Sequence, residues 1–208
     1  MTIALVAFDM VGVVLDEERV VSNALWNMLP DPKSIARDEL KARYDDGLRL
    51  GRLSAERFWD GVVDGSWQEF ERTFLNSLRL TPGAQAAMTS IAVTKRVAVV
   101  SDLPARWACP ILSRAGVDGA VSLAVFADEH GGARKKDGEL LKILSREAEL
   151  QPNQIVLIDD TVANALAAEE QDMNAIWFAR DGRDPGDFHG RRIRGFDQLG
   201  DCLAAFDS

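Results

Sequence analysis

The chain has 208 residues, of which 47% are hydrophobic and 27% charged, and 24 Lys and Arg against 33 Asp and Glu give it a formal net charge of -9. This composition excludes a disordered chain, and the length allows one to two domains with a buried core. The sequence lacks the run of ~18 apolar residues that a membrane span needs, and its acidic balance argues against a nucleic-acid partner, although a local anion site remains possible.

Five short apolar runs predict buried strands, at residues 3–8, 97–100, 121–127, 155–158 and 175–178. Helical patterns occupy residues 139–150 and 161–171, the second with Thr161 or Asp160 in position to cap it. A Gly-, Asp- and Arg-rich stretch at 181–194 predicts a surface loop before a last helix at 197–206. Strands that alternate with helices indicate an α/β, Rossmann-like core with a parallel sheet.

Residues 16–80 differ from the rest because they contain no convincing strand. Helical patterns at 34–50 and 54–63 fill this stretch, and Thr81-Pro82-Gly83 is a strong turn signal at its end. The sequence therefore predicts a core domain of residues 1–15 plus 81–208 and an inserted helical domain of residues 16–80.

Polar residues follow the predicted strands where a parallel sheet binds its ligands, at the carboxyl ends. They are Asp9, Ser101, Asp102, Asp159 and Asp160, with the basic run 134–136 after the strand at 121–127. A buried group of carboxylates needs a cation to stay ionised, and oxygen ligands favour Mg²⁺. Such an ion commonly acts together with a phosphate, and a carboxylate nucleophile attacking phosphorus is a reasonable role for Asp9.

Four segments resemble, in order, the motifs of the haloacid dehalogenase-like (HAD) hydrolase superfamily. They are residues 8–16 (FDMVGVVLD), 99–102 (VVSD), 132–137 (GARKKD) and 155–168 (IVLIDDTVANALAA). The helical insertion after the first motif is similar to the family's helical cap.

The resemblance implies a role for each matching residue. Asp9 would be the nucleophile that forms an aspartyl-phosphate, Ser101 would bond the phosphoryl group, and Lys135 would neutralise charge between them. Asp102 follows Ser101 and falls at the same substrate site, although another anion there would repel a phosphate. The implied Mg²⁺ ligands are Asp9, the main-chain carbonyl of Val11, Asp160, and Asp159 directly or through water.

One position departs from the family's phosphatases, which carry a second Asp two residues after the nucleophile as general acid and base. Val11 stands there and can do neither, and the loss of such a group typically costs about 10²–10⁴-fold in rate. Three interpretations follow. A water or another side chain replaces the acid; the protein is a haloacid dehalogenase or phosphonatase type; or it binds a phosphorylated ligand with little turnover.

We therefore expect a Mg²⁺-dependent hydrolase of a small phosphomonoester, with a sugar phosphate as one candidate. We also expect a cytoplasmic protein, a monomer or homodimer. The apolar start of the chain is short and lacks the basic region of a signal peptide, and Cys109 and Cys202 match no metal or redox spacing.

Overall fold

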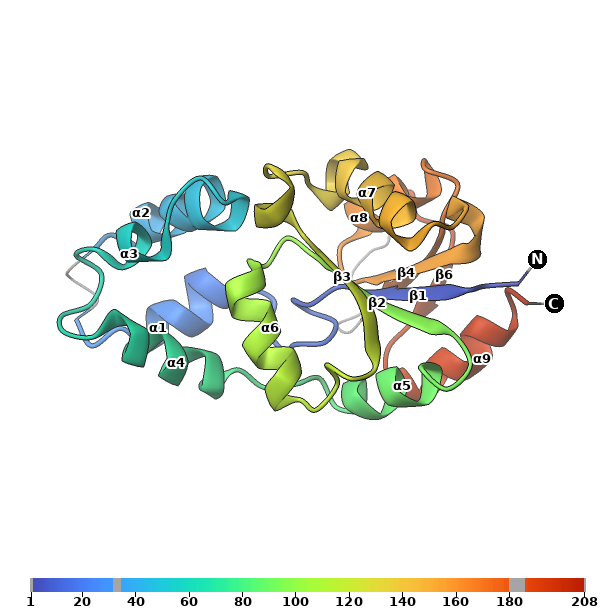
Figure 1. Cartoon of the computed structure of the whole chain (residues 1–208), viewed down its shortest axis with the longest axis horizontal. Helices are drawn as coiled ribbons and strands as arrows, with labels where there is room; N and C mark the ends of the chain where they lie inside the picture. Colours follow the sequence, from blue (N-terminus) through green and yellow to red (C-terminus); the bar gives the residue numbers. More distant parts are fainter. Residues whose placement is uncertain (1, 32–34, 180–185, 208) are drawn as a thin grey trace.

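The computed structural model describes residues 2–31, 35–179 and 186–207, and within them six strands form one parallel sheet. The strands are β1 (Leu5–Phe8), β2 (Arg96–Ser101), β3 (Val121–Phe126), β4 (Ile155–Asp159), β5 (Asn174–Phe178) and β6 (Arg191–Ile193). Their order across the sheet is β3-β2-β1-β4-β5-β6, so the first strand of the chain lies near the centre (Figure 1). The predicted α/β, Rossmann-like fold is confirmed.

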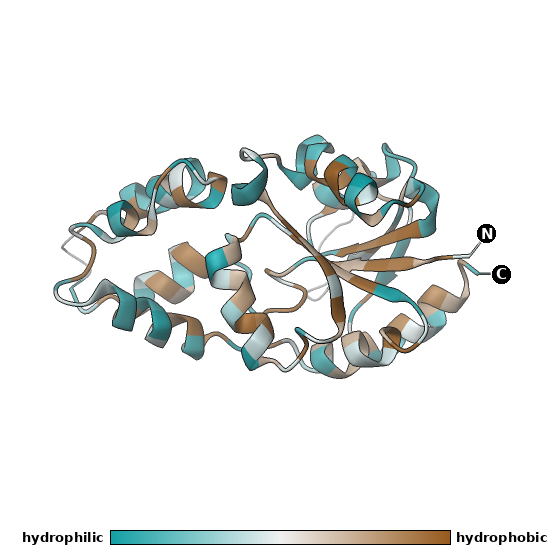
Figure 2. Cartoon of the chain, in the orientation of Figure 1, coloured by the Kyte–Doolittle hydropathy of each residue, from teal (hydrophilic) through white to brown (hydrophobic). Residues whose placement is uncertain are grey.

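The central strands β1 and β4 are apolar and buried, apart from the buried Asp159 at the end of β4, because both faces of the sheet are covered. Successive residues of β1 alternate between two hydrophobic clusters: Val6 and Phe8 belong to one, and Leu5 and Ala7 to the other. Figure 2 shows the central strands mainly in hydrophobic colours and much of the peripheral helices in hydrophilic ones.

The helices of the core divide between these two faces. Figure 1 shows α5 (Ala84–Ile91), α6 (Ala105–Arg114) and α9 (Leu199–Ala204) on one face, and α7 (Glu139–Ala148) and α8 (Val162–Glu169) on the other. Apolar side chains of α7 and α8, such as Leu140 and Ala165, join the cluster of Leu5 and Ala7. Of the core helices, α7, α8 and α9 lie within the ranges that the sequence predicts, whereas α5 and α6 were not predicted individually.

The stretch between β1 and β2 is helical, as predicted. Its helices are α1 (Trp26–Met28), α2 (Arg37–Ala42), α3 (Ala55–Trp59) and α4 (Trp67–Ser77), together with the π-helical turns η1 (Val20–Leu25) and η2 (Arg43–Gly47) and the 3-10 turn η3 (Leu48–Leu50). The two connections to the core lie side by side, since the amide of Asp16 donates to the carbonyl of Arg79 at 2.9 Å. One buried hydrophobic cluster runs from the sheet into this insertion, and the domain boundaries near residues 15 and 81 stay a prediction.

A buried carboxylate joins the insertion to the core. Glu71 of α4 is 7% exposed and accepts hydrogen bonds from the indole N–H of Trp59 at 2.9 Å and of Trp107 at 2.7 Å. Arg106 of α6 forms an ion pair with the same carboxylate. Because Trp107 belongs to α6 and Trp59 to α3, this contact fixes helices of the insertion against the core.

The predicted loop at residues 181–194 is partly wrong. Residues 181–185 lie outside the described part of the chain, but Arg191–Ile193 form β6 at the edge of the sheet. Only Ile193 of this strand is buried, so the strand lacks the apolar run that marks the central ones. No helix in the described ranges is long and apolar enough to cross a membrane.

Candidate active site

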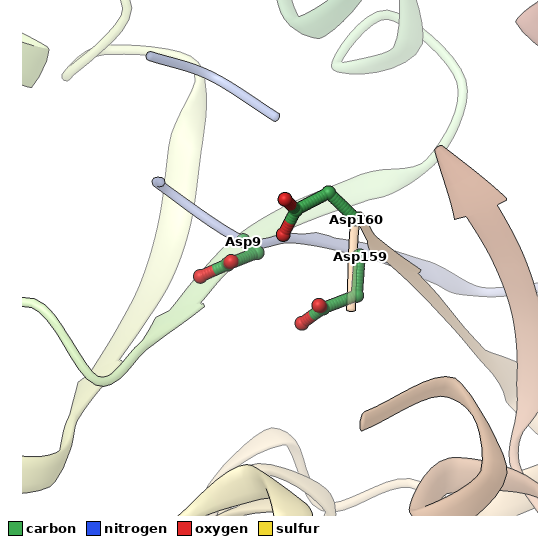
Figure 3. A group of neighbouring side chains, drawn as sticks. All are labelled: Asp9, Asp159 and Asp160. Atoms are coloured by element: carbon green, nitrogen blue, oxygen red, sulfur yellow. The ribbon is translucent and has the colours of Figure 1, made fainter. Parts of the chain in front are cut away.

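Three acidic residues meet at the carboxyl ends of β1 and β4. The parallel register places Phe8 opposite Ile158, so Asp9, the next residue, lies beside Asp159 and Asp160. Carboxylate oxygens of the three residues lie within 4.8 Å of one another, and Figure 3 shows the three side chains gathered beside these strand ends. The sequence prediction that these residues share one edge of the sheet agrees with this arrangement.

Lys135 lies between two of these carboxylates. Its Nζ is 2.6 Å from Oδ1 of Asp9 and 2.6 Å from Oδ2 of Asp159. The side chain of Lys135 is only 1% exposed, and Asp9 and Asp159 are buried with it. A buried ammonium with two carboxylate partners is held in one place, because either partner left alone would be an uncompensated buried charge.

The three carboxylates outnumber the single ammonium of Lys135, and this imbalance shifts the pKa values of Asp9 and Lys135. Burial, opposed by Lys135, and the neighbouring charges of Asp159 and Asp160 raise the pKa of Asp9 to about 8. Burial alone would lower the pKa of Lys135, but the charges of Asp159 and Asp9 raise it above its ordinary value. The site therefore has an excess of negative charge that a further cation would offset.

Asp159 and Asp160 differ in what holds them. Asp159 accepts hydrogen bonds from the side-chain amide of Asn164 at 3.0 and 3.1 Å and from the backbone amide of Thr161 at 2.9 Å, in addition to Lys135. Asp160 is partly exposed and lines a cavity, and the Thr161 hydroxyl donates to its Oδ1 at 3.2 Å. Asp160 is thus the more accessible of the two to a ligand in the cavity.

The loop after β1 passes directly over Asp160. Gly12 there has a φ of +82°, and a Cβ on it would come within 2.3 Å of Oδ2 of Asp160. Glycine is required on both grounds, conformation and space. The donor set of this region is carboxylate oxygen, which suits Mg²⁺; Asp9 and Asp160, with Asp159 behind them, are the residues that could hold it.

Ser101, at the end of β2, lies against Asp9. Its hydroxyl donates to Oδ1 of Asp9 at 3.1 Å and accepts from the backbone amide of Leu103 at 3.0 Å. The serine is buried, and this bonding fixes its oxygen at the floor of the cavity.

A cavity of about 980 Å³ lies above this cluster and extends into the insertion. Asp9, Val11, Ser101, Asp102, Lys135 and Asp160 line it on the core side. Residues of the insertion that line it include Arg19, Arg37, Lys41, Tyr44, Asp45 and Arg49. All but one of the predicted site residues therefore line one cavity, and Asp159 lies just beneath it, bonded to Lys135.

Asp102 is engaged by the insertion. Nη2 of Arg49 lies 2.5 Å from Oδ2 of Asp102, and the amide of Lys135 donates to Oδ1 at 3.4 Å. Burial would raise the pKa of Asp102, but Lys135 and Arg49 together lower it below its ordinary value. Its carboxylate is thus an anchor for Arg49 in this structure.

The sequence analysis missed Arg49, Asn164 and Tyr44. Asn164 follows Asp159 by five residues in the first turn of α8, a spacing that could have indicated a bond to the strand end. Arg49 and Tyr44 lie in an insertion without motifs, where no spacing relates them to the sheet.

A family model described as haloacid dehalogenase-like hydrolase matches residues 3–172. Compared by structure, the chain is similar to a HAD phosphatase from Thermococcus onnurineus (TM-score 0.74, 19% identity, covering 97% of this chain and 98% of that one). It is also similar to a 2-haloacid dehalogenase from Pseudomonas syringae pv. tomato DC3000 (TM-score 0.70, 19% identity, covering 99% of this chain and 100% of that one). A putative HAD hydrolase from Bacillus subtilis, bound to magnesium, is similar as well (TM-score 0.71, 17% identity, covering 98% of this chain and 99% of that one). Identities this low establish a shared fold, and no curated protein matches the chain in sequence.

Proposed function

This chain belongs to the haloacid dehalogenase-like hydrolase family, and we propose that it is a Mg²⁺-dependent phosphatase that hydrolyses a small phosphomonoester through an aspartyl-phosphate on Asp9. The observation that carries the proposal is the group of three carboxylates, Asp9, Asp159 and Asp160, with Lys135 inserted among them. This arrangement holds more negative charge than Lys135 balances, and a divalent cation supplies the difference.

The acidic group favours a phosphatase over a dehalogenase. The similar structures include both types, so the fold does not separate them. A 2-haloacid is itself a carboxylate, and next to Asp9 and Asp160 it would meet repulsion that the neighbouring Lys135, already paired with Asp9 and Asp159, offsets only in part. A phosphate bound together with Mg²⁺ avoids that repulsion.

In the proposed reaction an oxygen of Asp9 attacks phosphorus, the bond from phosphorus to the ester oxygen breaks, and water then releases phosphate from Asp9. Ser101 already directs its hydroxyl to Asp9 and would donate to a phosphoryl oxygen. Lys135 would hold Asp9 in position and neutralise charge as the phosphoryl group arrives. Bound Mg²⁺ would offset the charge of the carboxylates and the phosphoryl oxygens.

The metal would rest on Asp9, Asp160 and the main-chain carbonyl of Val11. Asp159 already accepts bonds from Lys135, Asn164 and Thr161, so we propose that it acts through water or by holding Lys135.

The test is steady-state hydrolysis of p-nitrophenyl phosphate by the wild type, with and without EDTA, and by Asp9→Asn. We expect both changes to abolish turnover. Asp172→Asn is the matched control, because Asp172 is exposed, does not line the cavity, and has a φ of 59° that Asn also tolerates. Activity that survives both Asp9→Asn and EDTA would refute the proposal, and halide released from 2-haloacids without Mg²⁺ would favour the dehalogenase type.

Val11 motivates the second candidate function, a weakly catalytic protein that binds a phosphorylated ligand. It lines the cavity two residues after Asp9 and offers no acid. Val11→Asp distinguishes the candidates. A large gain in rate would show that the natural protein lacks its acid, whereas a substantial wild-type rate that this change leaves unaltered would exclude the binding-only function.

We further propose a small phosphorylated metabolite as the substrate and the cytoplasm as the location. Both Cys109 and Cys202 are free thiols, which suits a reducing compartment. The expectation of a monomer or homodimer without a nucleic-acid partner stays a prediction.

A further inference from the structure

Tyr44 is a buried phenol that faces the cavity without a bonding partner. It lies in η2, is 9% exposed, and lines the cavity above Asp9. Its hydroxyl has no hydrogen-bond partner within residues 2–31, 35–179 and 186–207. The ring is buried, but the hydroxyl is accessible from the cavity, so a ligand bound there can accept its hydrogen bond.

The ring of Tyr44 is held rigidly from behind. It stacks on Trp107 of α6 with ring centroids 5.5 Å apart and an interplanar angle of 13°. The indole N–H of Trp107 in turn donates to the buried Glu71 at 2.7 Å. The core thus fixes the position of a side chain that the insertion supplies.

Two cations on the same side of the cavity, Arg49 and Lys41, have partners of their own. Arg49 bonds Asp102 and Asp45, and Lys41 forms an ion pair with Asp45. Tyr44 is therefore a donor in the cavity wall that a substrate need not compete for.

The direction of attack places the leaving group on the side of the insertion. Asp9 lies at the ends of the strands, and in phosphoryl transfer the attacking and leaving oxygens lie roughly in line on opposite sides of phosphorus. The leaving oxygen then points away from the sheet, toward the wall that carries Tyr44. Val11, beside Asp9, has no proton to give it.

We propose that Tyr44 protonates the leaving-group oxygen, and so performs the acid chemistry that Val11 cannot; this inference rests on the proposed phosphatase function. In the first step Asp9 bonds to phosphorus, the ester P–O bond breaks, and the proton of Tyr44 passes to the departing alkoxide, which leaves a phenolate and an alcohol. In the second step water attacks phosphorus, its proton returns to the phenolate, and the bond from phosphorus to Asp9 breaks to release phosphate.

The surroundings keep Tyr44 in its acid form. Burial, only partly opposed by Arg49, raises the pKa of Tyr44 above its ordinary value. The carboxylates of Asp45, Asp102 and Asp9 raise this pKa further. An alkoxide is a stronger base than a phenolate, so the transfer runs in the required direction.

The experiment compares two substrates in the full-length protein with Mg²⁺. An alkyl ester such as glycerol phosphate needs a proton on its leaving oxygen, whereas p-nitrophenolate leaves without one. For Tyr44→Phe we expect kcat/KM on glycerol phosphate to fall by about 10²–10⁴-fold, and kcat/KM on p-nitrophenyl phosphate to change by only a few fold. The Phe ring keeps the stack on Trp107, and an unchanged thermal melting curve confirms that the fold is intact.

Glu18 is the rival donor, a carboxylate in the wall of the same cavity. Equal losses of Tyr44→Phe on the two esters would overturn the proposal, because they would indicate a role in packing or binding. A loss confined to the alkyl ester in Glu18→Gln, with Tyr44→Phe unaffected, would also overturn it. A wild type inactive on both esters would refute the phosphatase function itself and this inference with it.

Discussion

The buried carboxylate of Glu71 should be a main source of stability, because it accepts from three side chains on two other helices. In Glu71→Ala the indole N–H groups of Trp59 and Trp107 both lose their acceptor inside the hydrophobic cluster. Each orphaned buried donor costs about 1–3 kcal/mol, so the two together cost about 2–6 kcal/mol. The side chain of Arg106 is 38% exposed and can turn to water, so its ion pair adds about 0–1 kcal/mol.

A loss of this size is a large part of the 5–15 kcal/mol that typically stabilises a folded domain. The assay is urea unfolding followed by tryptophan fluorescence and by circular dichroism, which should give coincident transitions if the protein unfolds in two states. Arg72→Ala is the control, since Arg72 is exposed on the same helix and should change the free energy of unfolding by less than about 0.5 kcal/mol. A loss below about 1 kcal/mol in Glu71→Ala, with the slope against urea unchanged, would refute the reasoning that these indoles depend on one acceptor.

Two further changes test other parts of the molecule. Gly12→Ala should weaken Mg²⁺ binding in titration calorimetry, because its Cβ would meet Asp160 at 2.3 Å. Gly61→Ala is the control, since Gly61 has a similar φ of +69° and a Cβ there would meet nothing within 4 Å. Equal effects of the two substitutions on Mg²⁺ binding would contradict the steric reason. Asp207→Asn should lower stability at neutral pH, because the side-chain hydrogen bond from Lys95 holds the pKa of Asp207 below its ordinary value. This stabilisation is complete above the pKa that Asp207 has in the unfolded chain, and it is lost as the pH falls through the pKa that Asp207 has in the folded protein. The free energies of unfolding of wild type and variant, measured in urea, should therefore converge in acid. A difference that persists in acid would show another cause.

The central strands could be predicted from the sequence because burial on both faces leaves a continuous apolar run. The edge strand β6 could not, since Arg191 and Arg192 are exposed and only Ile193 packs inward. The same limit applies to the helices of the insertion, where the prediction for residues 54–63 exceeds α3 (Ala55–Trp59) because the pattern alone does not mark where a short helix ends.

The floor of the site could also be predicted, because parallel strands bring their carboxyl ends to one edge whatever the loops do. Asp9, Ser101 and the acidic pair follow strands directly, so their positions depend only on the sheet. Arg49 and Tyr44 depend instead on how the insertion packs against α6, which is a matter of side-chain contacts such as the stack on Trp107 and has no periodicity in the sequence.

The central place of β1 also affects how the chain can fold as it is synthesised. Leu5 pairs with Arg96 on one side and with Ile155 on the other, so the first strand made must wait for partners that come far later. At roughly 5–20 residues per second, about 150 residues take on the order of 10–30 s to follow. During that time the insertion, whose contacts are more local, is already complete and can form its helices. An apolar strand therefore stays unpaired on the ribosome until β2 arrives, and this interval is when the nascent protein is most exposed to aggregation or to capture by a chaperone.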